Sequence, residues 1–490
     1  MSSELLSLST DEFIGNIGEL ARSHFDCKGY PQENLRADDW ALLVRAGVLL
    51  PALPREYGGR DSHLEMCRVV EALAEWNLPL GMYTKIITAV ALRPIALRAS
   101  EETRREMLPL FAGRDPMICG FASTEPGCGS AMANMGTTFE EVDGGYRIRG
   151  RKHWQGFSST AHWWLLSAKS DAGGQRRYGY FIVKRSEGFR TVQRYEPLGM
   201  KLLDYGLNEI DAFVPRHRRI DAEDRNLSAM VDMLMPPRSM MATIASGFLR
   251  RISREAQAYA DNRVIGSEML SDIGFARYRL KAIETSATIC EALNDYVMTA
   301  LNVKVDMTDV FPVAQALKTV ATERMVSSAY HYQQLVGGEG YRVDSPTNIA
   351  GKAFLDTRVF TIFDGTNDLL SQQLTQFCLK RRGARSLSGF LAARCPYTGP
   401  GIVKHGLDMR FLDQELKQEH LVLGGRAIAY AFAITQLTRW AQQVGGDAVD
   451  RAREAIEFLK CDIDGIAREF ALLATGVLDD DEVVPNRLAA

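Results

Sequence analysis

The hydrophobic periodicity of this chain changes twice, and this pattern limits the fold more than any other feature of the sequence. Up to about residue 117, apolar residues such as Val69 and Leu73 recur at helical spacing. Short β-rich runs separated by glycine-containing turns then fill residues 118 to about 230. Helical spacing returns at about residue 237. The pattern predicts an α+β protein, mainly α, and the absence of βαβ alternation argues against a doubly wound fold.

Several individual elements are predicted within this pattern. Ser9 and Glu12 form a capping box ahead of the first apolar helical run. Gly337 and Gly338 end a long helix. Strands are expected at 146–149, 163–168, 178–183 and 210–214, and helices at 272–302, 309–336 and 411–474, with a loop at 383–410.

The length of 490 residues favours about three domains at roughly 150 residues each. The changes of periodicity place the boundaries. We expect an N-terminal helical domain at 1–117, a middle β domain at 118–232, a C-terminal helical bundle at 233–383 and a helical extension at 384–490.

Composition excludes several classes of function. The formal net charge is −3, with no long basic tract, so a nucleic-acid partner is not expected. No uninterrupted apolar stretch reaches the roughly 18 to 20 residues of a membrane span, and the N-terminus lacks the pattern of a signal peptide. Eight scattered cysteines without metal-ligand spacing indicate a reduced, cytoplasmic protein that binds no metal.

Three glycine-containing segments carry the chemical information. They are Phe121–Ser130, Gln334–Tyr341 and Phe363–Asp368. Taken singly, they suggest a glycine-rich loop, a helix C-cap and a turn. The first segment lacks the third glycine of a dinucleotide-binding fingerprint and follows no βαβ pattern, so it is not a Rossmann loop.

Taken together and in this order, the segments resemble the motifs of the acyl-CoA dehydrogenases. The family pattern is TEPGxGS, a lysine-led strand with Trp, ERxxFG, QxxGGxGY and YEGTNE. The matching residues here are Thr124–Ser130, Lys152–Trp154, Asn262–Gly266, Gln334–Tyr341 and Phe363–Asp368. The resemblance implies helical, β and four-helix-bundle domains in that order, together with an FAD cofactor.

The resemblance also implies roles for individual residues. Thr124 would hydrogen-bond the flavin ring, and Phe121 and Trp154 would line it. Arg263 would hold the pyrophosphate and adenosine part across a dimer interface, as a bidentate donor suits phosphate. The residues assigned to the cofactor are Phe121, Thr124, Ser130, Trp154, Arg263, Gln334, Gly338, Thr366 and Asp368.

The implied reaction is α,β-dehydrogenation of an acyl thioester, on coenzyme A or on a carrier protein. A carboxylate removes the α-proton, and the β-hydrogen leaves as hydride to flavin N5. By position the base is Asp364, and Arg238 matches the family's arginine near the base. Pro237 occupies the position from which some members supply the base, and proline cannot act as one.

Asp364 departs from the family, because most members have Glu there. Aspartate reaches about 1.5 Å less far, and a displacement of about 1 Å can cost on the order of a hundredfold in rate. Three interpretations remain open at this point: a dehydrogenase with an unusual acyl group, a flavin oxidase or monooxygenase like the nitroalkane-oxidising relatives that also use Asp, or a non-catalytic flavin-bound interaction protein.

The extension at 384–490 lies beyond the standard family length. Its apolar spacing favours extra packing over a surface that other members use to form tetramers, so a homodimer is expected. A membrane or carrier-protein contact is the alternative, and the mixed charges of the polar face support membrane binding only weakly. A dehydrogenase would also need an electron acceptor such as an electron-transfer flavoprotein.

Overall fold

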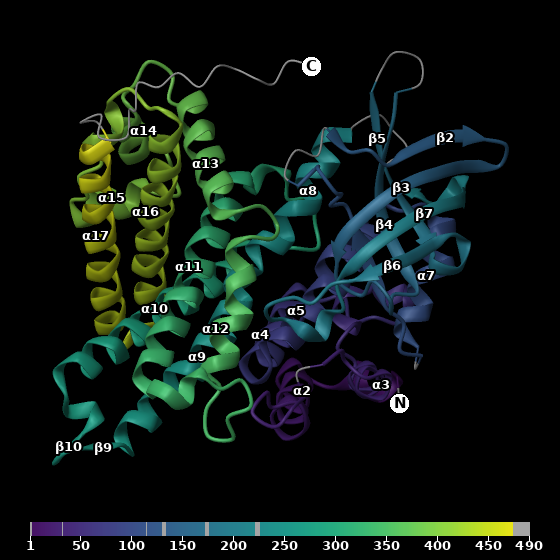
Figure 1. Cartoon of the computed structure of the whole chain (residues 1–490). Coiled ribbons are helices and arrows are strands. Elements are labelled where there is room, and N and C mark those ends of the chain that lie inside the picture. The colour runs from purple at the N-terminus through teal and green to yellow at the C-terminus, as the bar shows by residue number, and fades with distance from the viewer. Residues whose placement is uncertain are drawn as a thin grey trace. The chain divides into compact units, whose positions relative to one another are not determined.

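The computed structural model describes residues 2–31, 33–113, 115–129, 134–171, 176–220 and 226–473. The chain divides into two compact units, Met1–Gly365 and Thr366–Ala490 (Figure 1). The boundary between the units falls inside the predicted bundle domain, and the predicted domain limits themselves stay predictions.

Helices form the N-terminal part of the first unit. The helices are α1 Ser2–Ser7, α2 Thr10–His24, α3 Ala37–Arg45, α4 His63–Trp76, α5 Leu78–Lys85, α6 Arg93–Arg98 and α7 Glu101–Ala112. The predicted capping box is confirmed: the Ser9 side chain accepts from Glu12 N, and the Glu12 carboxylate accepts from Ser9 N.

A π-helical segment, Ile86–Leu92, joins α5 to α6 without a break. π-Helical turns are rare and are often found at functional sites. The continuous stretch Leu78–Arg98 is long and apolar enough to cross a membrane, and so is Gln418–Val444. This is weak evidence, because 83% and 78% of these stretches are buried inside the protein, as in ordinary core helices.

The middle of the first unit is one eight-stranded sheet. The strands are β1 Cys119–Ala122, β2 Thr138–Val142, β3 Gly145–Gln155, β4 Trp163–Ser170, β5 Arg177–Lys184, β6 Phe189–Arg194, β7 Gly206–Pro215 and β8 Arg219–Ile220. Their order is β6-β7-β3-β2-β4-β5-β8, with β1 parallel to β4. Strand β4 is a nearly continuous buried run, as a central strand covered on both faces requires, whereas β7 alternates buried and more exposed residues.

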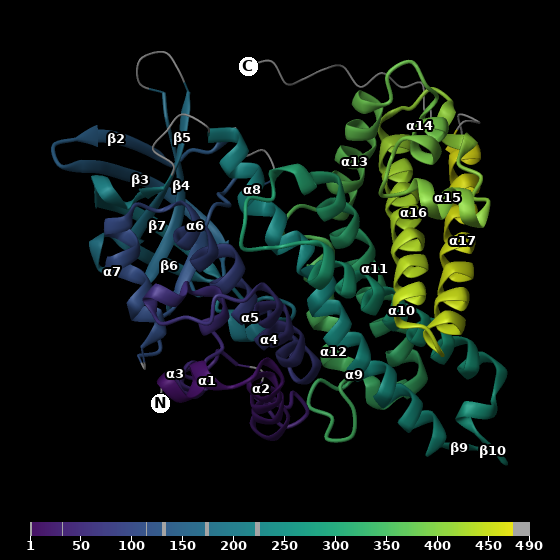
Figure 2. The ribbon, with the colours of Figure 1, turned by 180° about the vertical axis from the view of Figure 1, so that it is seen from behind.

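Long helices complete the first unit. They are α8 Asn226–Ser239, α9 Met241–Asp261, α10 Gly274–Ala300, α11 Phe311–Val336 and α12 Ala350–Thr357, with a hairpin of β9 Val264–Ile265 and β10 Glu268–Met269 between α9 and α10. Helix α9 packs against α4, α10 and α11. The hairpin and the sheet lie at opposite ends of this unit (Figures 1 and 2).

The predicted fold class is confirmed: α+β, mainly α, with helices, a β domain, further helices and a helical extension. The helices at 272–302 and 309–336 appear as α10 and α11, and α11 ends at Val336 with Gly337 as its cap at φ 73°. The loop predicted at 383–410 is wrong in part, because it contains α14 Leu387–Ala393 and α15 Gly399–His405. Ser386 caps the first of these, and Pro400 lies in the first turn of the second.

The second unit is helical throughout its described part. Besides α14 and α15 it contains α13 Asn367–Arg381, α16 Gln418–Val444 and α17 Ala448–Leu473. Helix α16 packs against α13, α15 and α17 (Figure 2). The contact with α13 is close enough that a Cβ atom on Gly425 would lie 1.9 Å from the backbone oxygen of Ser371.

Replacing Gly425 with Ala is therefore expected to destabilise the second unit. The added methyl group would force the two helices apart, and overpacking of this kind typically costs about 1–3 kcal/mol. The matched control is Gly465→Ala in α17, where a Cβ would meet nothing within 4 Å. That change should stabilise the helix by about 1 kcal/mol. Denaturant unfolding of both variants measures these effects. An unchanged midpoint for Gly425→Ala would contradict the close packing of α13 and α16.

Candidate active site

Asp364 lies in a turn with an unusual backbone conformation. The turn follows the short 3₁₀ segment η12, Arg358–Thr361. The φ angle is 57° at Asp364 and 94° at Gly365, so both residues are left-handed. Aspartate and asparagine enter this region more readily than other residues with a Cβ. The Asp364 side chain is 23% exposed, so it is partly accessible.

Two buried cations hold the backbone of this turn. Arg238 Nε, from α8, donates to the Asp364 carbonyl oxygen at 2.9 Å, and Arg238 Nη1 donates to Gln315 Oε1 at 3.0 Å. Lys318 Nζ, from α11, donates to the Gly365 carbonyl oxygen at 2.9 Å. Burial lowers the pKa of Arg238 to about 10 and that of Lys318 to about 7, while the charge of Asp364 opposes both shifts.

A third cation contacts the carboxylate itself. Lys85, the last residue of α5, places its Nζ 3.3 Å from Asp364 Oδ2. The Lys85 side chain is 0% exposed. Burial lowers the pKa of Lys85, and the neighbouring Asp364 carboxylate works in the opposite direction. Three helices thus each supply one cation to a two-residue turn.

The loop after β1 is joined to strand β3 at the two residues predicted to face the flavin. His153 N and Gln155 Nε2 both donate to the Thr124 carbonyl oxygen, at 2.9 and 3.0 Å. Between these donors lies Trp154, with φ 61°, at a shift of register in the pairing of β3 with β7. Thr124 and Trp154 are therefore neighbours. Phe121, in β1, is half-buried and stacks on Tyr180 at 6.3 Å between ring centroids.

Trp154 and two tyrosines form an aromatic face beside Asp364. The Trp154 side chain is 51% exposed, and its ring lies 4.7 Å from Tyr195 and 6.1 Å from Tyr205 between centroids. Burial raises the pKa of Tyr205, and so do the nearby carboxylates of Asp356 and Asp364. Tyr205 therefore lies close to both the aromatic face and the candidate base.

A buried ion pair holds the same loop in place. Lys152 Nζ lies 2.6 Å from Glu125 Oε1, and both side chains are buried. Lys152 Nζ also donates to the Ser123 carbonyl oxygen at 3.1 Å. Burial lowers the pKa of Lys152 to about 8, against the effect of Glu125. Glu125 accepts further bonds from the backbone N–H groups of Gly136 and Thr137, so one carboxylate ties the loop to β2 and β3.

Arg263, Gln334 and Gly338 lie apart from this centre. All three are exposed, near the β9–β10 hairpin and the ends of α9 and α11 (Figure 1). Tyr259 OH donates to the Val336 carbonyl oxygen at 3.1 Å and so joins the two helix ends. The structure brings these three residues to one end of the unit. Elsewhere it places Thr124 beside Trp154, and Tyr205 lies close to both Trp154 and Asp364.

Comparison with known protein families identifies the family of this chain. Models of the N-terminal, middle and C-terminal domains of acyl-CoA dehydrogenase match residues 16–115, 120–211 and 227–379. The chain belongs to the acyl-CoA dehydrogenase family. It is a member of a family of flavin-dependent oxidoreductases.

Individual relatives agree with this assignment. Isovaleryl-CoA dehydrogenase of Oryza sativa subsp. japonica mitochondria is 26% identical over 339 residues, which cover 67% of this chain and 80% of the relative. An acyl-CoA dehydrogenase from Bacillus anthracis, solved in complex with FAD, has a TM-score of 0.75 at 19% identity and covers 96% of this chain and 88% of its own. The prolyl acyl carrier protein oxidase AnaB has a TM-score of 0.67 at 17% identity, covering 75% of this chain and 98% of its own.

The residues present fit the flavin cofactor of the family. The exposed, left-handed Trp154 offers an aromatic surface to a planar ring, beside the Thr124 loop. At the other end, a Cβ on Gly337 or Gly338 would meet nothing within 4 Å, so bare backbone faces open space there. Besides capping α11, such glycines let a phosphate group approach the backbone closely.

The other residues predicted to bind the cofactor are Ser130, Thr366 and Asp368. Ser130 lies outside the described residues. Thr366 and Asp368 belong to the second unit, where the Thr366 hydroxyl caps α13 by accepting from Leu369 N at 3.3 Å. The Asp368 carboxylate pairs with Arg426 at 2.8 Å. These contacts account for both side chains structurally.

Two members of the site escaped the sequence analysis, namely Lys85 and Lys318. Each interrupts an apolar helical run, within Leu78–Leu92 and Phe311–Val320. A lone lysine in such a run is the signal that could have indicated a buried charge, because lysine is almost never fully buried unless it has a partner. Nothing local in the sequence identifies the partner of either lysine.

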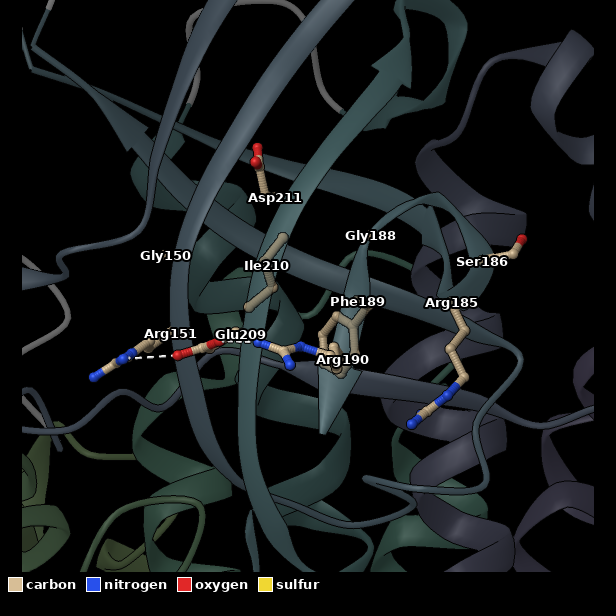
Figure 3. A pocket seen from close by; sticks show the side chains of 10 residues that line it. All are labelled: Gly150, Arg151, Arg185, Ser186, Gly188, Phe189, Arg190, Glu209, Ile210 and Asp211. Carbon is tan, nitrogen blue, oxygen red and sulfur yellow. Dashed lines mark hydrogen bonds and ion pairs between the residues drawn. The ribbon is translucent and has the colours of Figure 1, made fainter. Parts of the chain in front are cut away.

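A separate groove of about 640 Å³ lies on the surface of the sheet and is unrelated to Asp364 (Figure 3). Residues of β3, β6 and β7 and the turn before β6 line it. Its arginines Arg151 and Arg190 both pair with Glu209, at 2.7 Å each. These are cross-strand pairs on a solvated face, and they point to no chemistry.

Proposed function

We propose that this family member binds FAD and dehydrogenates an acyl thioester at its α and β carbons, with Asp364 as the base. The acyl group would be carried by coenzyme A or by a carrier protein. The observation that carries the proposal is the position of Asp364: it occupies the family's base position, its side chain is partly exposed, and cations from three helices hold its turn. A base must be fixed to within a fraction of an ångström for efficient proton transfer.

The chain's own residues would deliver and fix the proton acceptor. A bound FAD would take up the hydride that leaves the β-carbon. Asp364 would remove the α-proton. The positive charges of Arg238, Lys318 and Lys85 would favour negative charge on the substrate as the proton leaves.

Partner proposals follow from the family and from exposed apolar residues. Ile265, Phe275 and Tyr278 are exposed near the β9–β10 hairpin. Their clustering with Arg263 supports a homodimer in which each subunit contributes to its partner's cofactor site.

An electron-transfer flavoprotein is proposed as the acceptor of electrons from the reduced cofactor. A cytoplasmic location remains a prediction.

Anaerobic mixing of the purified, FAD-loaded protein with a panel of acyl thioesters tests the function. The panel should vary chain length and branching, with each acyl group offered on coenzyme A and on a carrier protein. We expect at least one thioester to bleach the visible flavin absorbance, followed by slow reoxidation in air. Rapid reoxidation would indicate an oxidase. A flavin that no thioester bleaches would favour the non-catalytic interpretation.

A further inference from the structure

Lys85 is a buried charge whose position the family assignment does not explain. Its ammonium lies 3.6 Å from Met241 Sδ and 3.9 Å from Met82 Sδ. Thioether sulfur is a weak acceptor. Within the described part of the chain, the charged group that Lys85 contacts is Asp364, through Oδ2 at 3.3 Å. Burying an ammonium costs several kcal/mol, so its presence opposite one carboxylate calls for a function.

The burial of Lys85 defines what that function can be. A side chain that is 0% exposed cannot contact a substrate, whereas Asp364 is 23% exposed. Lys85 can therefore act only through Asp364. Its backbone adds to the case, because Lys85 is the residue at which α5 passes into the π-helical segment Ile86–Leu92. Such segments are often found at functional sites.

We propose that Lys85 is a positioning residue for Asp364: it holds one carboxylate oxygen and so fixes the direction in which the group points. The inference rests on the proposed role of Asp364 as the base. The three contacts also explain how the shorter aspartate can serve at this position. Arg238 holds the backbone carbonyl group of Asp364, Lys318 holds that of Gly365, and Lys85 holds the Asp364 side chain.

Other charged or polar groups face Asp364 from neighbouring elements. Arg238 and Lys318 face it from α8 and α11, and Tyr205 lies close by. Arg238 donates to the backbone carbonyl oxygen of Asp364 and Lys318 to that of Gly365, whereas Lys85 donates to the side-chain atom Oδ2.

The test separates kcat from KM for thioester-dependent flavin reduction in Lys85→Met. A base that is no longer aimed should lower kcat on the order of a hundredfold while KM changes little, because a displacement of about 1 Å can cost that much in rate. Lys85→Arg, which restores a donor to Asp364 Oδ2, should recover part of the lost kcat. Lys352→Met is the matched control, because Lys352 is also buried but donates to the carbonyl oxygens of Cys27 and Tyr30.

A second readout does not depend on activity. Thermal unfolding of Lys85→Met, Asp364→Gly and the double variant forms a mutant cycle, because glycine removes the carboxylate and still tolerates the left-handed turn. The double variant should unfold at a higher temperature than the sum of the two single shifts predicts, because each single change leaves a buried or half-buried partner unpaired. Additive shifts together with a wild-type kcat in Lys85→Met would overturn the inference. If instead Asp364→Asn keeps its activity, the proposed base is wrong and the failure lies with the function.

Discussion

Replacing Asp364 with Asn is expected to slow thioester-dependent flavin reduction by about 10²–10⁴-fold, the usual contribution of a general base. Asparagine has the same shape as aspartate and also tolerates the left-handed backbone, with φ 57°, that this turn requires. Its amide oxygen can still accept from Lys85. The loss should therefore appear in the rate of reduction, with FAD content and unfolding temperature close to the wild type. Rapid-mixing absorbance of the flavin measures it.

Two further variants test this prediction. Asp408→Asn removes an exposed carboxylate of the second unit, which pairs with Arg410 at 2.6 Å, and should leave the rate unchanged. Asp364→Glu adds one methylene group, which moves the carboxylate by about 1.5 Å and should cost on the order of a hundredfold despite matching most of the family. Reduction of Asp364→Asn at the wild-type rate would show that another group takes the proton.

Replacing Lys152 with Met should have the largest effect on stability. The change leaves the Glu125 carboxylate buried without its cation, and breaking a buried pair in this way typically costs about 3–5 kcal/mol. Glu125 also ties the Thr124 loop to β2, so FAD retention should fall with stability. The neighbouring Arg151 faces solvent and pairs with Glu209 at 2.7 Å. Arg151→Met should cost no more than about 1 kcal/mol, as exposed pairs contribute little.

The pH dependence of this effect has a definite sign. Burial lowers the pKa of Lys152 to about 8, and an unfolded lysine has a pKa of about 10.4. Between about pH 8 and about pH 10.4, the unfolded wild-type protein binds more protons than the folded protein does. The free energy of unfolding of the wild type therefore rises with pH in this range, whereas that of Lys152→Met lacks this rise. Against the effect of burial, the charge of Lys152 holds the pKa of Glu125 below its usual value. Denaturant unfolding should thus show a gap between wild type and variant that widens from about pH 8 to 10 and narrows in acid. A gap that is constant across pH would contradict this account of the pair.

The sequence was informative where local pattern decides structure. Periodicity located the sheet and the long helices, and the motif order led to Asp364, Arg238 and the pairing of Thr124 with Trp154. It did not reveal Lys85, because nothing local indicates that a lysine 279 residues away meets Asp364. The short helices α14 and α15 were also missed. Seven residues are too few to show helical periodicity, and the Gly and Pro that begin α15 resemble loop chemistry.

The three contacts that hold the Asp364 turn also bear on the order in which the molecule forms. They join residues 279, 126 and 47 positions apart in the chain, through Lys85, Arg238 and Lys318 respectively. Contacts between such distant segments form only after the chain has paid the entropy of closing long loops. A partly folded chain can therefore hold most of its helices and its sheet while Asp364 still lacks a defined position. We expect the Asp364 turn to form late in the folding of the first unit and to be lost when α5, α8 and α11 separate.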